Sequence, residues 1–351
     1  MEKNNISHFK SVHNAKLFGI MPGGNEVWEY KLSGRGGMEV CFINYGAAIT
    51  SLKVPTADGK KTDVVLGFDT LENYIKSYAL QGAPYIGAVV GRYAGRIKGG
   101  RFRLNDNDFQ LSKNHGNNTL HGGVTGFGQV LWEAELQGSS ILFSYTSPDG
   151  DEGFPGELTV KVIYTVTDDN ELLIEYKATT TKDTVLNLTQ HSYFNLEGHS
   201  QTIEEQELFI NSSKLLETNA ENIPTGFILN VANCPFDFSR PKKCPYKIDT
   251  SFVLQETVLP QASLFSSATG LLMSVFTNQP SVHIYVGGSC SGKLKGKDGA
   301  DYHELSGICF ETQNFPDAPN HAHFPNAELK KGEEYYKYTR FKFEQIKKQD
   351  L

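Results

Sequence analysis

The sequence predicts an all-β fold, a sandwich or a barrel with few short helices. Runs in which apolar and polar residues alternate recur along the 351-residue chain, as expected for strands that bury one face. Thirty-four glycines and fourteen prolines separate these runs, and both residue types favour turns. Only two short segments, residues 71–76 and 319–323, have a helical pattern. Many strands with few helices are typical of β-sandwiches and barrels.

The predicted strands follow one another in hairpins, with Asp and Asn at the turns. Residues 101–104 and 109–111 flank a turn at 105–108, and residues 158–166 and 171–178 flank a turn at 168–170. Asp and Asn suit such turns because they tolerate left-handed backbone and form local hydrogen bonds. No linker or internal repeat stands out, so we expect one domain over residues 1–351. Further strands are expected at residues 27–32, 39–43, 141–146, 271–276, 282–286, 308–311 and 338–343.

Charge and composition narrow the functional class. The net charge of −7 argues against nucleic acid or an anionic membrane surface as a partner. The five cysteines are odd in number and widely spaced, without a CxxC pair, which favours free thiols in a reducing compartment over disulfides or zinc. The N-terminus lacks the apolar core of a signal peptide, and no apolar run is long enough to span a membrane. We therefore expect a soluble cytoplasmic protein.

The segment LTQHSYFN, residues 188–195, carries the clearest chemical signal. Its His191 can give or take a proton near neutral pH, because the unperturbed pKa of imidazole lies nearest neutrality. The neighbouring Ser192 and Tyr193 are short polar and aromatic groups, which suit the hydroxyls and apolar C–H faces of a hexose. Taken alone, the segment fits a core histidine on a strand equally well.

Two further segments combine cationic or imidazole side chains with glycines. Residues 86–97 contain Arg92 and Arg96 among small residues, where an arginine could donate several hydrogen bonds to hydroxyls or a ring oxygen. The alternative is a surface charge at a strand end. In residues 118–123, His121 precedes two glycines, which allow a ligand to approach the backbone closely. The alternative is a turn that happens to contain histidine.

An acidic side chain completes the set. Glu311 follows the apolar run 308–310, and a carboxylate inside or at the end of a buried strand is costly unless it is paired or functional. The acidic residues 147–156 do not fit the EF-hand pattern, so we expect a structural loop there. Basic and acidic proton carriers without a metal or nucleotide motif fit proton transfer on a neutral polyol. They do not fit hydride, phosphoryl or metal-assisted chemistry.

Two other segments are less informative than they look. Residues 292–299 are basic and glycine-rich, but they lack the ending of a phosphate-binding loop, so a solvated loop is expected. His321 and His323 would share one side of a strand, yet no Cys or carboxylate stands at ligand spacing for zinc.

Several ordered motifs together resemble the aldose 1-epimerase (galactose mutarotase) family. They run from about residue 44 to about residue 343, and HSYFNL and ETQNFPDAPN are the most specific. The resemblance implies a large antiparallel β-sandwich of the galactose mutarotase-like supersandwich type, with the sugar in an open cleft and no cofactor. It also implies interconversion of the α and β anomers of hexoses such as galactose and glucose. The motifs are GRYAGRI, NTLHGG, SPDGDEGFPGEL, LNLTQHSYFNLEG, QPSVHIYVG, LKGKDGADY and FETQNFPDAPN.

The resemblance also implies roles for single residues. Glu311 matches the base that removes the C1 hydroxyl proton, and His191 matches the acid that protonates the ring oxygen, so that the ring opens, turns about C1–C2 and closes again. His121 and Arg96 match groups that hold and polarise the sugar near the ring oxygen and C1. The other residues implied to bind or line the site are Asp249, Ser192 and Tyr193. A hexose is the implied partner, and we expect a monomer or weak dimer.

Two positions depart from the family pattern, and three other functions compete. Gly95 stands where many members carry Asn, and His283 where relatives often hold Gln, so both affect the expected affinity. A hexose-6-phosphate epimerase of the same fold would need a cationic pocket. A non-catalytic sugar-binding protein would need neither His191 nor Glu311. A glycoside hydrolase would need two carboxylates across the bond, for which only Glu311 and Asp249 qualify.

Overall fold

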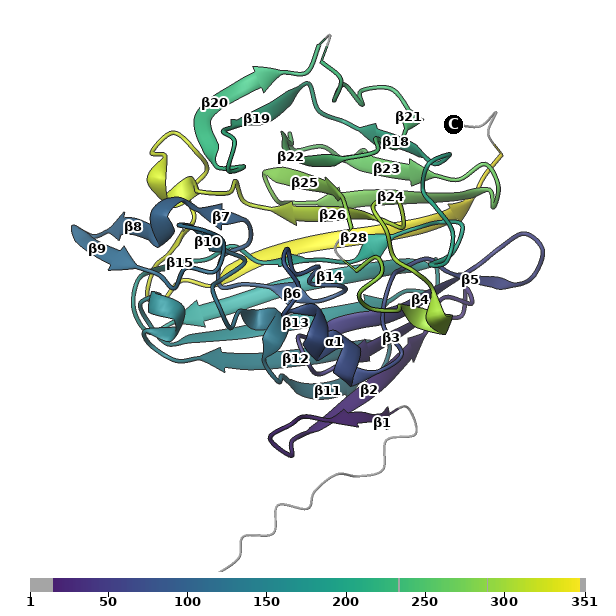
Figure 1. Ribbon diagram of the computed structural model, residues 1–351, viewed down its shortest axis with the longest axis horizontal. Helices are drawn as coiled ribbons and strands as arrows, with labels where there is room; N and C mark the ends of the chain where they lie inside the picture. Colours follow the sequence, from purple (N-terminus) through teal and green to yellow (C-terminus); the bar gives the residue numbers. More distant parts are fainter. Residues whose placement is uncertain (1–14, 233, 289, 348–351) are drawn as a thin grey trace, which may run out of the picture.

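The computed structural model describes residues 15–232, 234–288 and 290–347, and three antiparallel sheets dominate it. A nine-stranded sheet forms one layer, with β28 near its middle (Figure 1). In order across the sheet, its strands are β11 (Glu133–Gln137), β12 (Ser140–Ser147), β13 (Leu158–Val166), β14 (Glu171–Thr180), β28 (Tyr335–Gln345), β24 (Leu271–Thr277), β23 (Ala262–Phe265), β18 (Glu207–Ile210) and β21 (Lys242–Lys243).

A six-stranded and a five-stranded sheet pack against the nine-stranded one. The six-stranded sheet runs β17 (Tyr193–Phe194), β26 (Ile308–Gln313), β25 (Ser281–Val286), β22 (Ile248–Val253), β19 (Lys214–Thr218) and β20 (Pro224–Asn230). The five-stranded sheet runs β1 (Ala15–Ile20), β2 (Glu26–Ser33), β3 (Glu39–Ile43), β4 (Ala48–Pro55) and β5 (Lys61–Asp63). Figure 1 shows the six-stranded sheet at the top and the five-stranded sheet below.

Short elements connect the sheets. The one α-helix in the described residues is α1 (Leu71–Ser77), which begins where the Thr70 side chain accepts a hydrogen bond from the Asn73 N–H. The two-stranded pairs are β6 (Val89–Val90) with β16 (Thr189–Gln190), β7 (Arg96–Ile97) with β10 (Thr119–Leu120), β8 (Arg101–Leu104) with β9 (Asn107–Gln110), and β15 (Thr184–Val185) with β27 (Glu328–Leu329).

One core joins the three sheets. Val160 and Tyr164 of β13, Phe42 of β3 and Ile284 of β25 belong to the same buried cluster. Burial alternates along β13 because successive side chains point to opposite faces. Burying both layers in one core confirms the predicted β-sandwich. The extent of a single domain stays a prediction of the sequence.

Three local expectations need correction. Residues 319–323 are not an α-helix: the short turn there is a 3₁₀ element over Ala318–Asn320. The turn after β8 is tighter than expected, since β9 already begins at Asn107. The loop at 292–299 is not solvated throughout, because Lys297 is buried and its Nζ pairs with Asp63 Oδ2 at 2.8 Å. No helix in the described residues has the length and apolar character that a membrane crossing requires.

Candidate active site

Glu311 lies on β26, a strand of the six-stranded sheet, and its side chain faces a cleft. On β26, Phe310 belongs to the core, while Glu311 lies on the opposite face and lines a cleft of about 190 Å³. This face is also buried, so every residue of β26 is buried. Register places His283 of β25 directly opposite Glu311, and Ser251 of β22 opposite His283. The three side chains therefore form a row across the sheet face.

His191 lies beside Glu311 at the floor of the cleft. Its backbone is fixed between strands, because the His191 N–H donates to Ala88 O at 2.9 Å and the Gly87 N–H donates to His191 O at 3.0 Å. The imidazole Nε2 is 3.5 Å from Glu311 Oε1, and the two side chains are 5% and 2% exposed. Glu311 Oε2 is buried without a hydrogen-bond partner among the described residues. The cleft thus offers an imidazole nitrogen and an unengaged carboxylate oxygen side by side.

His121 enters the cleft from the turn after β10. The Gly95 N–H donates to His121 Nδ1 at 3.2 Å, so the ring proton of the neutral imidazole resides on Nε2. Burial, together with the nearby charges of His191 and Arg96, lowers the pKa of His121 well below its ordinary value. The ring lies 5.4 Å from that of His191, centroid to centroid. His121 is therefore a neutral donor beside the acid–base pair.

Asp249 accepts hydrogen bonds from several polar side chains on the other side of the cleft. Arg96 Nη2 donates to its Oδ2 at 3.2 Å, and Asn222 Nδ2 donates to the same oxygen at 2.9 Å. His283 Nε2 is 2.9 Å from Asp249 Oδ1, and His283 Nδ1 is 2.8 Å from the Ser251 hydroxyl. Burial opposes ionisation of Asp249, but His283 and Arg96 outweigh it and hold the pKa of Asp249 well below its usual range.

The same contacts shift the pKa of His283 in the opposite direction to that of Asp249. Burial alone would lower its pKa, yet the hydrogen bond to Asp249 and the charge of Glu311 more than offset burial and raise the pKa of His283 above its ordinary value. His283 and Arg96 together place two cationic groups on one carboxylate. This network fixes the donors and acceptors that face the cleft.

Most residues expected at the site lie in this one cleft. They are Gly95, Arg96, His121, His191, Tyr193, Asp249, His283 and Glu311. Ser192 is buried but is not among the residues that line the cleft, and its hydroxyl accepts a hydrogen bond from Gln190 Nε2 at 2.9 Å. Several lining residues were not expected from the sequence. These are Tyr85, His115, Asn222, Tyr285 and Gln313. Of them, Tyr285 and Gln313 had a usable signal, since they stand two positions from His283 and Glu311 on the same strand faces.

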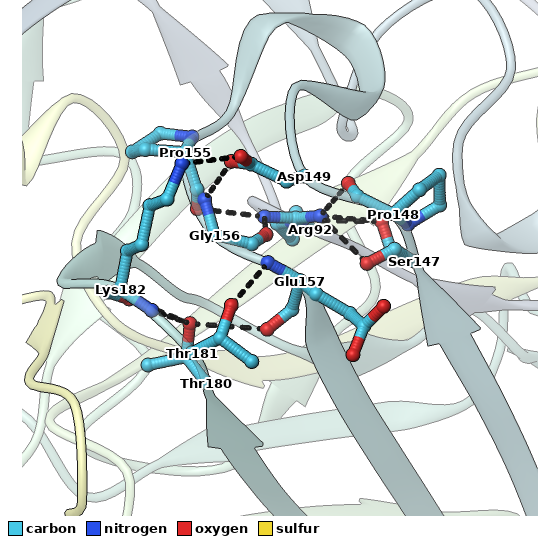
Figure 2. Close-up of polar contacts among 10 residues, drawn as sticks. All are labelled: Arg92, Ser147, Pro148, Asp149, Pro155, Gly156, Glu157, Thr180, Thr181 and Lys182. Atoms are coloured by element: carbon cyan, nitrogen blue, oxygen red, sulfur yellow. Dashed lines mark hydrogen bonds and ion pairs between the residues drawn. The ribbon is translucent and has the colours of Figure 1, made fainter.

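Arg92 is neither a ligand-binding arginine nor a surface charge, the two interpretations of its motif. It is buried, neither lining the cleft nor forming a surface charge, and its guanidinium binds the loop 147–156 (Figure 2). That loop is structural, as expected. A larger groove of about 1360 Å³ lies elsewhere, along the start of β28, and contains none of the expected site residues.

His121, His191 and Glu311 offer ligand atoms that all lie within 4.8 Å of one another. Two imidazoles and one carboxylate are ligand types that zinc accepts. The same atoms are also those that a proton transfer would use. A chelator therefore distinguishes the two kinds of chemistry.

Comparisons with known proteins agree with the fold and with the motifs. The aldose 1-epimerase family model matches residues 29–342. The galactose mutarotase of Bos taurus is 42% identical over 339 residues, covering 93% of this chain and 97% of that protein. The aldose 1-epimerase of Haemophilus influenzae is 38% identical, covering 92% and 97%. An aldose epimerase homologue from C. elegans superposes with a TM-score of 0.83 at 31% identity, covering 90% and 98%. Matched over nearly its whole length, the chain belongs to the aldose 1-epimerase family, a family of isomerases.

Proposed function

We propose that this chain, an aldose 1-epimerase by family, interconverts the α and β anomers of free hexoses such as galactose and glucose. The observation that carries the proposal is the 3.5 Å approach of His191 Nε2 to Glu311 Oε1 on the floor of a cleft. The C1 hydroxyl and the ring oxygen of a hexose are bonded to the same carbon. An acid and a base that lie 3.5 Å apart can therefore reach the C1 hydroxyl and the ring oxygen of one sugar.

The mechanism is a pair of proton transfers. Glu311 takes the proton of the C1 hydroxyl, while protonated His191 gives a proton to the ring oxygen, and the bond between C1 and the ring oxygen breaks. The aldehyde turns about C1–C2, and the ring closes with the two roles reversed. His121 donates from Nε2 toward the sugar, and Arg96 and Asp249 hold its hydroxyls. The protons return to their starting groups after closure.

Charge in the cleft supports a free sugar over a sugar phosphate. Among the described residues that line it, Arg96 is the one Lys or Arg, and it is already paired with Asp249. A phosphate would find no unengaged cation of that kind. A glycoside hydrolase would need Asp249 or Glu311 to donate a proton to the leaving group. The low pKa of Asp249 makes it a poor acid. Glu311 would then have to be the acid, and His191 beside it would have no role.

Polarimetry on freshly dissolved sugars tests the proposal. The chain should speed the approach of α-D-galactose and α-D-glucose to their equilibrium rotation. Methyl α-D-galactoside, which has no anomeric hydroxyl, should show no change. A strong preference for glucose 6-phosphate, or cleavage of the glycoside, would overturn the proposal. EDTA should leave the rate unchanged, and a loss that added Zn²⁺ reverses would contradict the cofactor-free mechanism.

We also propose that the protein works in the cytoplasm as a monomer or weak dimer. Cys41, Cys234, Cys244 and Cys309 are free thiols, which suits a reducing compartment. The five side chains proposed to act on the sugar all line one cleft of this chain: His191, Glu311, His121, Arg96 and Asp249. The proposed mechanism therefore uses no group from a second copy.

A further inference from the structure

The loop between β12 and β13 is held by one buried cation. Arg92 Nη1 donates to Pro155 O at 3.0 Å and to Gly156 O at 2.8 Å, while Nη2 donates to Pro148 O at 2.9 Å and to the Ser147 hydroxyl at 2.6 Å (Figure 2). Arg92 thereby binds both ends of the loop. Burial lowers the pKa of Arg92 to about 10, so the guanidinium is still charged at neutral pH.

This anchored loop carries Glu152 at its tip. The Glu152 backbone has φ of +50° and its carbonyl accepts a hydrogen bond from the Ser112 N–H at 2.9 Å. Its carboxylate accepts two more, Oε2 from the Val124 N–H and Oε1 from the Thr125 N–H, both at 2.9 Å. A Cβ added at Gly123 would lie 2.3 Å from Glu152 Oε2, so the carboxylate can approach only because glycine is there.

The segment that Glu152 holds begins with His121. His121, Gly122 and Gly123 have φ of +51°, +92° and +116°, three successive residues in the left-handed region. The two glycines adopt positive φ readily, but His121 is not a glycine, and its conformation persists only when the surroundings fix it. The His121 N–H donates to Gly95 O at 3.0 Å on one side. On the other side, Asn114 Nδ2 donates to Gly123 O at 2.7 Å, and Glu152 binds the two N–H groups that follow.

We infer that Glu152 is a positioning residue for His121, and that Arg92 fixes the loop that presents it. Glu152 does not line the cleft, so it acts through the turn and not on the sugar. Its two hydrogen bonds hold the turn in the conformation that keeps His121 Nδ1 against the Gly95 N–H and Nε2 toward the sugar. The activity part of the inference rests on the proposed function.

Kinetics of Glu152→Ala and Glu152→Gln test this relay. Since misplacing a catalytic group by about 1 Å can cost on the order of 100-fold, we expect Glu152→Ala to lower kcat about tenfold. Glu152→Gln keeps one acceptor but turns an amide N–H toward the other donor, so its loss should be smaller. In a His121→Ala background, Glu152→Ala should change kcat less than about twofold, because residues that act as a unit are not additive.

Asp168→Ala is the matched control. Asp168 is also a turn carboxylate that accepts a backbone N–H, that of Arg35 at 2.9 Å, but it lies at the far end of β13 from the loop 147–156. Asp168→Ala should leave kcat unchanged within about twofold, because the side chain of Asp168 binds Arg35, which does not line the cleft. Equal losses from Glu152→Ala with and without His121, or no loss in either Glu152 variant, would overturn the inference.

Nuclear magnetic resonance of the imidazole nitrogens provides a readout that does not need activity. The His121 signals, assigned by their absence in His121→Ala, should show the neutral Nε2–H form in the wild type. They should shift in Glu152→Gln and Glu152→Ala but not in Asp168→Ala. Unchanged His121 signals in both Glu152 variants would refute the relay even if the protein proved inactive on every hexose. A shift in a protein without mutarotase activity would refute the proposed function alone.

Discussion

Glu311 and His191 are small parts of a large sheet, yet the proposed chemistry depends on these two side chains. Glu311→Gln keeps the shape of the side chain but removes its ability to take a proton. We expect kcat to fall on the order of 100- to 10,000-fold while sugar binding persists. Polarimetry measures the rate, and calorimetry measures binding. A variant that keeps more than about a tenth of wild-type kcat would show that Glu311 is not the base.

The raised pKa of His283 gives a pH-dependent stability. A group whose pKa is raised on folding stabilises the native state fully below its unfolded pKa, about 6.5 for histidine, and this contribution is lost as pH rises through the folded pKa. His283→Gln removes the ion pair with Asp249. The variant should therefore lose most stability at about pH 6 and little at about pH 9. Urea unfolding at both values checks this, and an equal loss at both would contradict it.

The sequence motifs predict that Gly95 departs from the family pattern, and the structure shows what an added side chain would meet. Gly95 has φ of +79°, and an added Cβ would lie 3.0 Å from Pro316 Cβ and Cγ. Gly95→Ala carries this backbone and contact cost without an amide, so it is the control for Gly95→Asn. One neutral hydrogen bond is worth about 0.5–1.5 kcal/mol, so KM for the preferred hexose should be about threefold to tenfold lower in Gly95→Asn than in Gly95→Ala. Equal KM values would show that the missing amide does not affect binding.

Single residues also mark the limit of sequence reasoning. The motifs led to His191 and Glu311, because a histidine among aromatic residues and an acid in an apolar run are unusual locally. The local chemistry of the segment did not separate Arg92 from Arg96, four positions apart, and the sugar was assigned to Arg96 only by the family resemblance. The fold shows that Arg92 binds a loop and that Arg96 faces Asp249. Tyr85 and Asn222 both have positive φ and lie outside the strands. No periodicity there marks a side chain as facing a ligand, although both residues line the cleft.

At the scale of elements, alternation was a good guide wherever a strand buries one face. β13 and β14 were expected within a few residues of their observed bounds, because their side chains alternate between core and solvent. The two-residue pair of β6 and β16 was not expected, since two residues carry no period. β26 is buried on both faces, so its polar residues do not follow a simple pattern.

The loop between β12 and β13 should be sensitive to substitution of Arg92. Arg92→Lys keeps a charge but offers one compact ammonium in place of the planar guanidinium that binds several carbonyls at once. Carbonyls left without a donor cost about 1–3 kcal/mol each when buried, so we expect the free energy of unfolding to fall by about 3 kcal/mol. Denaturant unfolding measures this loss. A change below about 0.5 kcal/mol, typical of surface substitutions, would contradict the structural role of Arg92.

At the scale of the whole molecule, the groups proposed to act on the sugar come together within one chain. His191, Glu311, His121, Arg96 and Asp249 line the same cleft. Specific activity should therefore stay constant when the enzyme is diluted from about 1 μM to about 1 nM, because dissociation of a weak dimer would remove no group from the cleft. Initial rates over this range, with light scattering to record mass, check the expectation. Activity that falls on dilution together with the mass would contradict it.

The ion pair between Arg96 and Asp249 joins residues 153 positions apart in the sequence. Contacts between distant segments form slowly during folding, because loop closure must come before the contact can stabilise anything. The cleft walls come from the six-stranded sheet and from connecting elements such as β7 and β10, so the cleft is complete only when both are in place. A sugar that binds only the native chain also favours it by mass action over every incomplete form. The substrate should therefore stabilise the fully folded chain, and sugar binding reports that folding is complete.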